Sequence, residues 1–380
     1  MDGLHVVHVI DSLTPGGAEM SLAVTAPQLI QRGIRLDVVA LKTRPGLRDR
    51  LVEAGATVTE LHGNRRTWWR SVAELVGERR PDIVHTTLFE ADLAGRIGAR
   101  RAGTPVVSTL ANEAYGAAHR SEYPNRRVKL LGAQLADLAS ARLTTRLHAV
   151  SHYVADVMAR RLRYPRARID VIPRGRDHEE LGRRTAERRR RARRELGVAP
   201  DEPLVLTVAR QERAKGLDVL IDSVKPLLKE FPSTKYMVAG RAGGASGYLL
   251  AQLIEVDAED TVTFLDVRED VASLLCAADV FVLPSRREGL PGSLLEAMAL
   301  ECPVVVSDLP QIREVVDDST ALIVPPEDSY ALADAIAQSL SDVPRARERT
   351  LAARQRFCER FTVGPVADRM IDFYERALAT

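Results

Sequence analysis

Short apolar runs alternate with helical patterns along almost the whole chain of 380 residues, and this alternation most constrains the fold. Repeated strand-helix-strand patterns are typical of parallel sheets covered by helices. Strands are predicted first at Leu4–Ile10, Leu36–Leu41, Val58–Leu61, Ile83–His85, Pro105–Thr109 and Leu147–Val150, and then at Leu204–Val208, Tyr236–Ala239, Val262–Phe264, Val280–Leu283, Val304–Val306 and Leu322–Val324. Because the length also exceeds what one core usually supports, the sequence predicts an α/β protein with two doubly wound, Rossmann-like domains.

An arginine-rich segment separates the two series of strands. We therefore predict an N-terminal domain over residues 1–172, a basic linker over 173–200, a C-terminal domain over 201–355, and a C-terminal helix over 356–380 that packs back on the first domain. The arginine run lacks the interleaved aromatic residues that stack on bases, and aromatics make up only 4% of the chain. A solvated linker helix is thus a better prediction than a nucleic-acid site.

Positive charge is concentrated in the first half of the chain. Residues 1–194 hold 35 Lys and Arg against 21 Asp and Glu, a net charge of +14, whereas residues 195–380 hold 19 against 31, a net charge of −12. A basic half suits an anionic partner such as a phosphorylated carrier or a lipid surface, although a merely solvated arginine surface explains the count equally well.

The location follows from what the sequence lacks. No apolar run approaches the roughly 18 residues of a membrane span, and the opening apolar run fits a first strand better than a signal peptide. Cys276, Cys302 and Cys358 are too few and too widely spaced for a disulfide framework or a zinc site. We expect a cytoplasmic protein, with peripheral contact at the inner face of the membrane left open.

The segment from Glu288 to Ala299 has the pattern of a ligand-binding loop. It follows the predicted strand Val280–Leu283, and two carboxylates, Glu288 and Glu296, flank a Gly-Leu-Pro-Gly turn that leads into an apolar helix. In open parallel sheets, ligands bind beyond the carboxyl ends of the strands, where a helix N-terminus favours an anion. Carboxylates placed there are suited to accept hydrogen bonds from sugar hydroxyls.

Two other strand-to-helix turns carry residues suited to a phosphate. Arg210 and Lys215 follow the first strand of the second domain, and together they could bind a diphosphate. Gly16 and Gly17 follow the first strand of the chain and would let the backbone approach a ligand closely. The three spaced glycines of the dinucleotide fingerprint are absent, so the sequence does not favour an NAD site.

Taken together, these motifs resemble glycosyltransferase family 4, whose members are retaining enzymes of the GT-B fold. The resemblance spans nearly the whole chain and is most specific at Glu288–Ala299. It implies that Arg210 and Lys215 neutralise the donor diphosphate, that Glu288 contacts the donor sugar, and that Glu296 holds the ribose. It also implies donor contacts at Gly16, Gly17, Val267, Arg268, Gly289, Leu290, Pro291 and Gly292, with Asp266 standing where the family commonly has glycine.

One position departs from the family pattern. Members commonly carry a histidine after the fifth strand of the first domain, and Ala111 stands there in this chain. A polar group near the acceptor could instead come from His85, Asn112, Glu113 or His119. The loss does not preclude transfer, because in a front-face retaining mechanism the leaving diphosphate can itself take the acceptor's proton.

The function that we predict is retaining transfer of a hexose or N-acetylhexosamine from a nucleotide sugar, with UDP preferred, to an acceptor hydroxyl in glycan, glycolipid or secondary-metabolite synthesis. The acceptor class stays open and includes phosphorylated and lipid-linked compounds. No metal is expected, because no Asp-x-Asp pair or His/Cys cluster is present, and no cofactor is expected beyond the donor. The alternatives are a nucleotide-sugar epimerase, a phosphorylase, and a degenerate partner protein that only binds a nucleotide sugar.

The stretch Tyr123–Leu131 begins a helix with two possible orientations. Its basic start and its leucines, which continue at Leu135, Leu138 and Leu143, fit a helix that docks at an anionic membrane surface. They fit better a helix that packs its leucines into the core, which is the usual arrangement in globular proteins.

Overall fold

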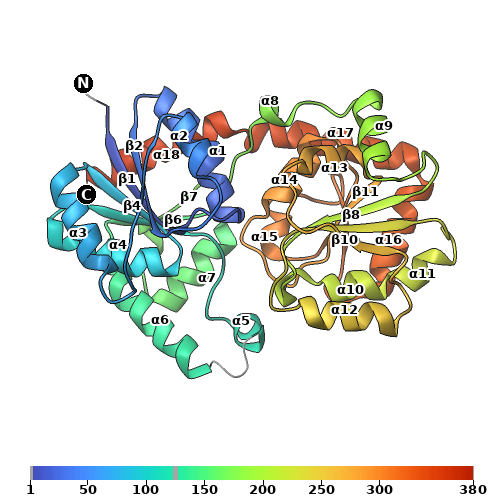
Figure 1. The fold of residues 1–380 in the computed structure, drawn as a ribbon, viewed down its shortest axis with the longest axis horizontal. Helices are drawn as coiled ribbons and strands as arrows, with labels where there is room; N and C mark the ends of the chain where they lie inside the picture. Colours follow the sequence, from blue (N-terminus) through green and yellow to red (C-terminus); the bar gives the residue numbers. More distant parts are fainter. Residues whose placement is uncertain (1–2, 123–126, 380) are drawn as a thin grey trace. The chain divides into compact units, whose positions relative to one another are not determined.

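The computed structural model describes residues 3–122 and 127–379 and forms two compact units. Unit 1 contains the chain as far as Asp177 and the segment from Phe361 onward, and unit 2 contains His178–Arg360. Each unit has a parallel sheet with helices on both faces (Figure 1). The prediction of two doubly wound α/β domains is confirmed.

The sheet of unit 1 has seven strands in the order β3-β2-β1-β4-β5-β6-β7. They are β1 (His5–Ser12), β2 (Arg35–Lys42), β3 (Thr57–Glu60), β4 (Ile83–Thr87), β5 (Val106–Leu110), β6 (Arg146–Ala149) and β7 (Ile169–Val171). The helices of this unit are α1 (Gly17–Gln31), α2 (Arg48–Glu53), α3 (Trp68–Arg79), α4 (Phe89–Ala102), α5 (Ala117–Glu122), α6 (Arg127–Ala141), α7 (His152–Leu162) and α18 (Val363–Leu378). The short edge strand β7 is the strand that the sequence pattern did not predict.

Two cores cover the two faces of this sheet, because successive residues of a strand point to opposite sides. Val6 and Ile10 of β1 belong to a core completed by helices α1 and α18. Val7 and Val9 belong to a core completed by α3 and α4. Strand β1 is therefore buried on both faces, which explains its continuous apolar run.

The sheet of unit 2 has six strands in the order β10-β9-β8-β11-β12-β13. They are β8 (Leu204–Val208), β9 (Lys235–Ala239), β10 (Val262–Phe264), β11 (Val280–Leu283), β12 (Val304–Ser307) and β13 (Leu322–Val324). The helices are α8 (His178–Leu181), α9 (Ala186–Glu195), α10 (Leu217–Asp222), α11 (Val224–Leu228), α12 (Ser246–Glu255), α13 (Val271–Ala277), α14 (Gly292–Ala299), α15 (Pro310–Arg313), α16 (Ser329–Ser341) and α17 (Val343–Arg360). Helices α10 and α12 lie on one side of this sheet, and α13 and α14 lie on the other (Figure 1).

The arginine-rich segment differs from the solvated linker predicted for residues 173–200. Its helix α9 belongs to unit 2 and packs on α13. Arg189 Nη2 and Arg193 Nη1 reach the two carboxylate oxygens of Asp279 at 2.6 and 3.1 Å, and the side chain of Arg193 is buried. The arginines therefore attach the helix to the domain, because they satisfy a carboxylate and nearby backbone carbonyls.

The C-terminal region is divided between the two units. Helix α17 ends at Arg360 in unit 2, and α18 packs against α1 in unit 1.

Among the described residues, no helix is both long enough and apolar enough to cross a membrane.

Candidate active site

The strongest candidate site in unit 2 lies where strands β8 and β11 end. These strands pair in parallel, so the loops that follow them emerge at one edge of the sheet. Lys215, at the end of the 3-10 turn Arg213–Lys215, donates to Glu288 Oε1 from Nζ at 2.7 Å. The structure thus brings together two residues that are 73 positions apart and that the sequence assigned to one donor site.

A glycine makes this approach possible. Gly216 has a φ of +63°, and a Cβ added to it would lie 1.9 Å from the backbone oxygen of Pro284, directly after β11. Both the positive φ and the close backbone contact disfavour any larger residue at this position. The two loops can therefore touch only because residue 216 has no side chain.

Arg286 fixes the two loops to each other. Its guanidinium donates two hydrogen bonds to the carboxylate of Asp218, at 2.7 and 2.8 Å, and a third to the carbonyl of Arg213 at 3.0 Å. Hydrogen bonding to Asp218 raises the pKa of Arg286 above its ordinary value. This charged, bidentate contact orders the loop that carries Lys215, and the side chain of Lys215 takes no part in it.

Glu288 is held by groups on three sides. Besides Lys215, Ser285 Oγ donates to Oε1 at 2.7 Å, and Gln311 Nε2 donates to the backbone carbonyl of Glu288 at 3.1 Å. Glu288 is only 6% exposed, so its charge depends on these contacts. The side-chain oxygen of Gln311 is buried and has no hydrogen-bond partner within the described parts of the chain, which leaves an acceptor next to the loop.

Other predicted donor residues of unit 2 lie in the segments that follow β8 and β11. Arg210 is exposed in the same strand-to-helix loop as Lys215. Gly289, Leu290 and Pro291 are buried and lead into α14, which begins at Gly292 and carries a half-buried Glu296 on its second turn. The first turn of a helix has backbone N–H groups without intrahelical acceptors, so this turn suits an anion.

The segment with the predicted donor contacts Val267 and Arg268 follows strand β10. Val267 is 56% exposed, and Arg268 donates two hydrogen bonds to Asp270, both at 2.7 Å. Asp266 has a φ of +52°. This left-handed conformation explains why glycine suits the position, and Asp is one of the few other residues that tolerate it.

In unit 1 the double glycine leads directly into helix α1. Gly16 is the N-cap in an extended conformation, and Gly17 is the first helical residue. A Cβ added to Gly17 would lie 2.5 Å from Nη1 of Arg174. The absence of a side chain therefore lets a guanidinium lie against the start of α1, where the sequence predicted a ligand phosphate.

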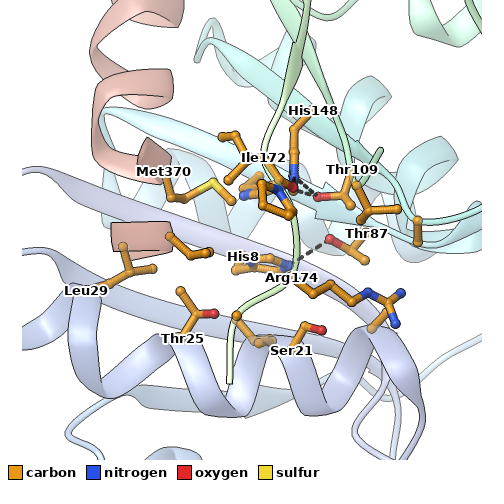
Figure 2. A pocket seen from close by; sticks show the side chains of 18 of the residues that line it. His8, Ser21, Thr25, Leu29, Thr87, Thr109, His148, Ile172, Arg174 and Met370 are labelled. Atoms are coloured by element: carbon orange, nitrogen blue, oxygen red, sulfur yellow. Dashed lines mark hydrogen bonds between the residues drawn. The ribbon is translucent and has the colours of Figure 1, made fainter. Parts of the chain in front are cut away.

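Arg174 also lines a cavity inside unit 1 (Figure 2). Hydroxyl groups of Ser21 and Thr25 from α1, and of Thr87 and Thr109 from β4 and β5, face this space. Ala111 lines it as well, so the position where the family commonly has histidine borders an open volume. The cavity is polar near the strand ends and apolar toward Leu29 and Met370 of α1 and α18.

Three buried histidines form one wall of this cavity. His8 Nε2 contacts Thr87 Oγ1 at 3.0 Å, and His85 Nδ1 contacts the Tyr374 hydroxyl at 2.8 Å. His148 Nε2 donates to the carbonyl of Ile172 at 2.8 Å.

Burial keeps these three rings neutral. Burial, together with the nearby charge of His148, lowers the pKa of His8 to about 3. Burial also lowers the pKa of His148 to about 4, and lowers that of His85 well below its ordinary value. All three histidines are therefore uncharged at neutral pH. A neutral ring can donate and accept hydrogen bonds, but it has no positive charge to attract an anion.

The four predicted acceptor residues do not form one group. His85 lines the cavity and is already bonded to Tyr374 and, through Nε2 at 2.7 Å, to Thr109. Glu113 pairs with Arg161 at 3.1 Å, and His119 Nδ1 accepts from the backbone N–H of Tyr115 at 3.0 Å. Asn112 is exposed. The sequence offered all four as possible polar groups near the acceptor, and of the four only His85 lines the cavity.

Sequence reasoning missed several residues that build the site. Ser285, Arg286 and Gln311 position the Glu288 loop, and Arg174 supplies the cation next to Gly17. Ser285 and Arg286 lie inside the motif and could have been examined as positioning residues. The role of Arg174 had no local signal, because it depends on a contact between residues 157 positions apart.

A second cavity, lined by aromatic side chains, lies between α3 and α4 in unit 1. Trp68, Trp69 and Phe89 line it together with Arg65 and Glu90. Glu90 is buried and forms ion pairs with Arg65 and with Lys42 at the end of β2. The indole N–H of Trp68 has no acceptor among the residues that the structure describes. Its aromatic rings and charged groups would suit a ligand with an apolar ring and polar substituents.

No metal centre is formed by the described part of the chain: residues 3–122 and 127–379 contain no group of three or more His, Cys, Asp or Glu that could hold an ion. Metal independence stays a prediction, because a cation carried by donor phosphates needs fewer protein ligands.

Comparison with known protein families covers both units. A model described as Glycosyltransferase Family 4 matches residues 15–180, and one described as Glycosyl transferases group 1 matches residues 202–342. Among curated relatives, a D-inositol 3-phosphate glycosyltransferase of Saccharomonospora viridis is 26% identical over 96% of this chain and 90% of its own length. A 2-deoxystreptamine N-acetyl-D-glucosaminyltransferase of Streptomyces fradiae is 28% identical over 96% of this chain and 91% of its own.

Solved structures show the same fold. Anabaena HepE in complex with UDP-glucose superposes with a TM-score of 0.86 over 98% of this chain and 100% of that chain, at 20% sequence identity. A sucrose-phosphate synthase from Thermosynechococcus elongatus superposes with a TM-score of 0.82 at 21% identity, over 99% of both chains.

Proposed function

We propose that this chain, which belongs to glycosyltransferase family 4 and has the GT-B fold, transfers a hexosyl or N-acetylhexosaminyl group from a UDP-linked sugar to an acceptor hydroxyl with retention of configuration. The observation that carries the proposal is the Lys215–Glu288 ion pair at the carboxyl ends of β8 and β11. A cation and a carboxylate held 2.7 Å apart provide, at one point, a group for phosphate and a group for sugar hydroxyls.

The donor diphosphate would bind to Lys215 and Arg210, with the first turn of α14 behind it. Lys215 would then be shared between Glu288 and a phosphate oxygen, so its charge would be fixed in place before the reaction begins. Glu296, one turn into α14, would accept hydrogen bonds from the ribose. Such preorganised charge is most effective where negative charge develops on the leaving group.

In the reaction the bond between the anomeric carbon and the diphosphate oxygen breaks, and a bond from that carbon to the acceptor oxygen forms on the same face. The departing diphosphate takes the proton of the acceptor hydroxyl. The protein's part is to stabilise the charge of the UDP that leaves, which requires cations and helix N-termini rather than a protein base. This step does not need the histidine that the family commonly has where this chain has Ala111.

We assign the acceptor to unit 1, and a cyclic polyol is the class that we favour. The two relatives named above are described as acting on D-inositol 3-phosphate and on 2-deoxystreptamine, which are both cyclitols. In this chain the hydroxyls of Ser21, Thr87 and Thr109 and the guanidinium of Arg174 face one cavity at the strand ends (Figure 2). Hydroxyls can pair with a polyol, and the guanidinium suits a phosphate if the acceptor carries one.

A reducing, cytoplasmic location is part of this proposal. The three cysteines are free, with Cys276 and Cys302 buried, and burial raises the pKa of Cys302 to about 11. Buried, protonated thiols behave as small apolar side chains and need no disulfide partner.

Detection of UDP release, followed by NMR of the product, tests the proposal. Incubation of UDP-glucose or UDP-N-acetylglucosamine with a panel of cyclitols should release UDP only when an acceptor is present, and the product should keep the donor's anomeric configuration. An altered sugar nucleotide formed without acceptor would indicate an epimerase instead. Tight UDP binding without turnover on any acceptor would indicate a non-catalytic partner protein.

A further inference from the structure

Helix α6 of unit 1 packs its polar side into the protein. Asp137 accepts a hydrogen bond from Arg96 Nη1 at 2.6 Å on one oxygen and from the Tyr115 hydroxyl at 2.8 Å on the other. Arg96 is fully buried, and its Nε also donates to Ser108 of β5 at 2.8 Å. A buried ion pair loses much of its stabilisation if one partner is withdrawn, so this network sets the rotation of α6 about its axis.

The opposite side of α6 exposes three large apolar residues, whereas Leu130 and Leu138 of the same helix are half-buried. Val128 is 86% exposed, Leu131 is 58% exposed and Leu135 is 57% exposed. Their spacing of three and then four residues aligns them in one stripe along the helix. A surface helix of a globular protein normally turns such a stripe toward the core, so an exposed stripe of this kind is unusual.

The charges around this stripe have one sign. Arg127 and Lys129 are exposed in the first turn of α6, and Arg142 is exposed just after its end. The one acidic residue between 127 and 142 is Asp137, which is buried against Arg96. The outer face of α6 therefore combines exposed leucines with cations and carries no carboxylate of its own.

We propose that the outer face of α6 docks on an anionic lipid surface. A helix with an apolar stripe and flanking Lys and Arg residues lies in the plane of the membrane interface, where leucines enter the acyl boundary and cations pair with lipid phosphates. Charge complementarity is the reason to favour a membrane over a second copy of this chain, because two copies would bring their cations together. The inference adds a partner to the proposed reaction and does not depend on its chemistry.

Co-sedimentation of the full chain with lipid vesicles tests the proposal. The protein should bind vesicles that contain phosphatidylglycerol and phosphatidylcholine, and should bind phosphatidylcholine vesicles much less. Each Lys or Arg replaced by a neutral residue on this face should weaken partitioning about fivefold. Raising the salt concentration should also release the protein, because it screens the attraction.

The decisive variant is Leu131→Glu combined with Leu135→Glu, matched by Leu250→Glu combined with Ile254→Glu on α12 of unit 2. The control residues are 54% and 68% exposed on their helix, so both double variants alter similarly exposed apolar residues. The α6 variant should lose vesicle binding, the α12 variant should keep it, and both should keep the circular dichroism spectrum of the unaltered chain.

Three outcomes would overturn the proposal. The unaltered chain could fail to bind phosphatidylglycerol vesicles at low salt. Both double variants could lose binding equally. The α6 variant could convert a dimer into a monomer by light scattering while vesicle binding is absent throughout, which would identify a second copy as the occupant. UDP release with a water-soluble acceptor in the absence of vesicles reports separately on the proposed reaction.

Discussion

At the scale of single residues, the account depends on Glu288 and Lys215. Glu288 is buried and accepts from both Lys215 and Ser285, so its charge is compensated before any donor binds. Replacing one partner of a buried pair leaves the other uncompensated, which makes the choice of substitution important. Glutamine in place of Glu288 keeps the size and the contact with Ser285, and it removes only the charge.

Glu288→Gln should lower kcat by roughly 10²- to 10³-fold, equivalent to about 2.7 to 4 kcal/mol of lost transition-state stabilisation. UDP affinity should stay equal or rise, because Lys215 loses its competing carboxylate. Steady-state kinetics and UDP titration measure the two effects separately. Glu230→Gln, an exposed change in the same unit, is the control and should alter neither quantity. Full turnover in the Glu288 variant would remove this residue from the mechanism.

His8 supplies a test of the cavity in unit 1. Its folded-state pKa is about 3, below the ordinary 6.5, so between these values the unfolded chain takes up a proton that the folded chain does not. This contribution to stability is complete above pH 6.5 and is lost as the pH falls toward 3, by up to about 1.4 kcal/mol per pH unit.

His8→Gln should therefore flatten the dependence of the unfolding free energy on pH below 6.5. Urea unfolding between pH 4 and pH 8 measures the slope for the variant and for the unaltered chain. His62→Gln replaces an exposed histidine and should leave the slope unchanged. Parallel curves for His8→Gln and the unaltered chain would show that His8 is protonated in the folded state.

At the scale of elements, the contact between the loops after β8 and β11 depends on Gly216. Gly216→Ala should destabilise unit 2 by at least about 1 to 2 kcal/mol, because the φ of +63° is strained for alanine and its Cβ would overlap the Pro284 carbonyl. It should also reduce transfer, since Lys215 precedes the displaced residue.

The control for that substitution is Gly247→Ala in α12, where nothing lies within 4 Å of the added Cβ. Gly247 lies in the first turn of α12, so alanine there should stabilise the protein by at most about 0.5 to 1 kcal/mol, the value for the middle of a helix. Urea unfolding, monitored by far-ultraviolet circular dichroism, compares the two variants. Equal effects of the two substitutions would contradict the role given to Gly216.

The strands and the loop at Glu288 could be predicted because their signals are local. A run such as Val280–Leu283 followed by a glycine- and proline-bearing turn predicts a buried strand and a loop at its end without reference to other parts of the chain. Ligand binding by that loop stays a prediction. The orientation of α6 could not be predicted in this way. Its leucines suggest an inward face, yet Leu131 and Leu135 are exposed, because the pairing of Asp137 with Arg96, 41 residues away, turns another side of the helix inward.

The burial of arginine in helix α9 could not be predicted from neighbouring residues either. A run of arginines predicts a solvated helix, yet Arg193 is buried because Asp279, 86 residues away, and nearby carbonyls accept its hydrogen bonds. Arg174 near Gly17 is a third example. In each of these cases a long side chain is placed by a distant partner, which a pattern of neighbouring residues does not record.

At the scale of the whole molecule, the chain contains two units of similar architecture with different chemistry. Unit 2 carries the ion pair and the helix start that suit a nucleotide diphosphate, whereas unit 1 carries hydroxyl-lined and aromatic cavities that suit an acceptor. Residues 1–177 of the first unit hold 27 Lys and Arg against 18 Asp and Glu, a net charge of +9, which agrees with an anionic partner for this unit. In the proposed function, donor and acceptor would each be bound by side chains at the strand ends of one of these two similar sheets.

The most direct test of this account is calorimetric titration of UDP into the unaltered chain, into Lys215→Met and into the control Lys229→Ala. Lys229 is an exposed cation of the same unit, so it matches the change in net charge. The account predicts saturable binding that weakens at least about tenfold in Lys215→Met, a loss typical of one charged hydrogen bond, and that is unchanged in Lys229→Ala. Equal UDP affinity for all three proteins would contradict the claim that the donor diphosphate binds at Lys215.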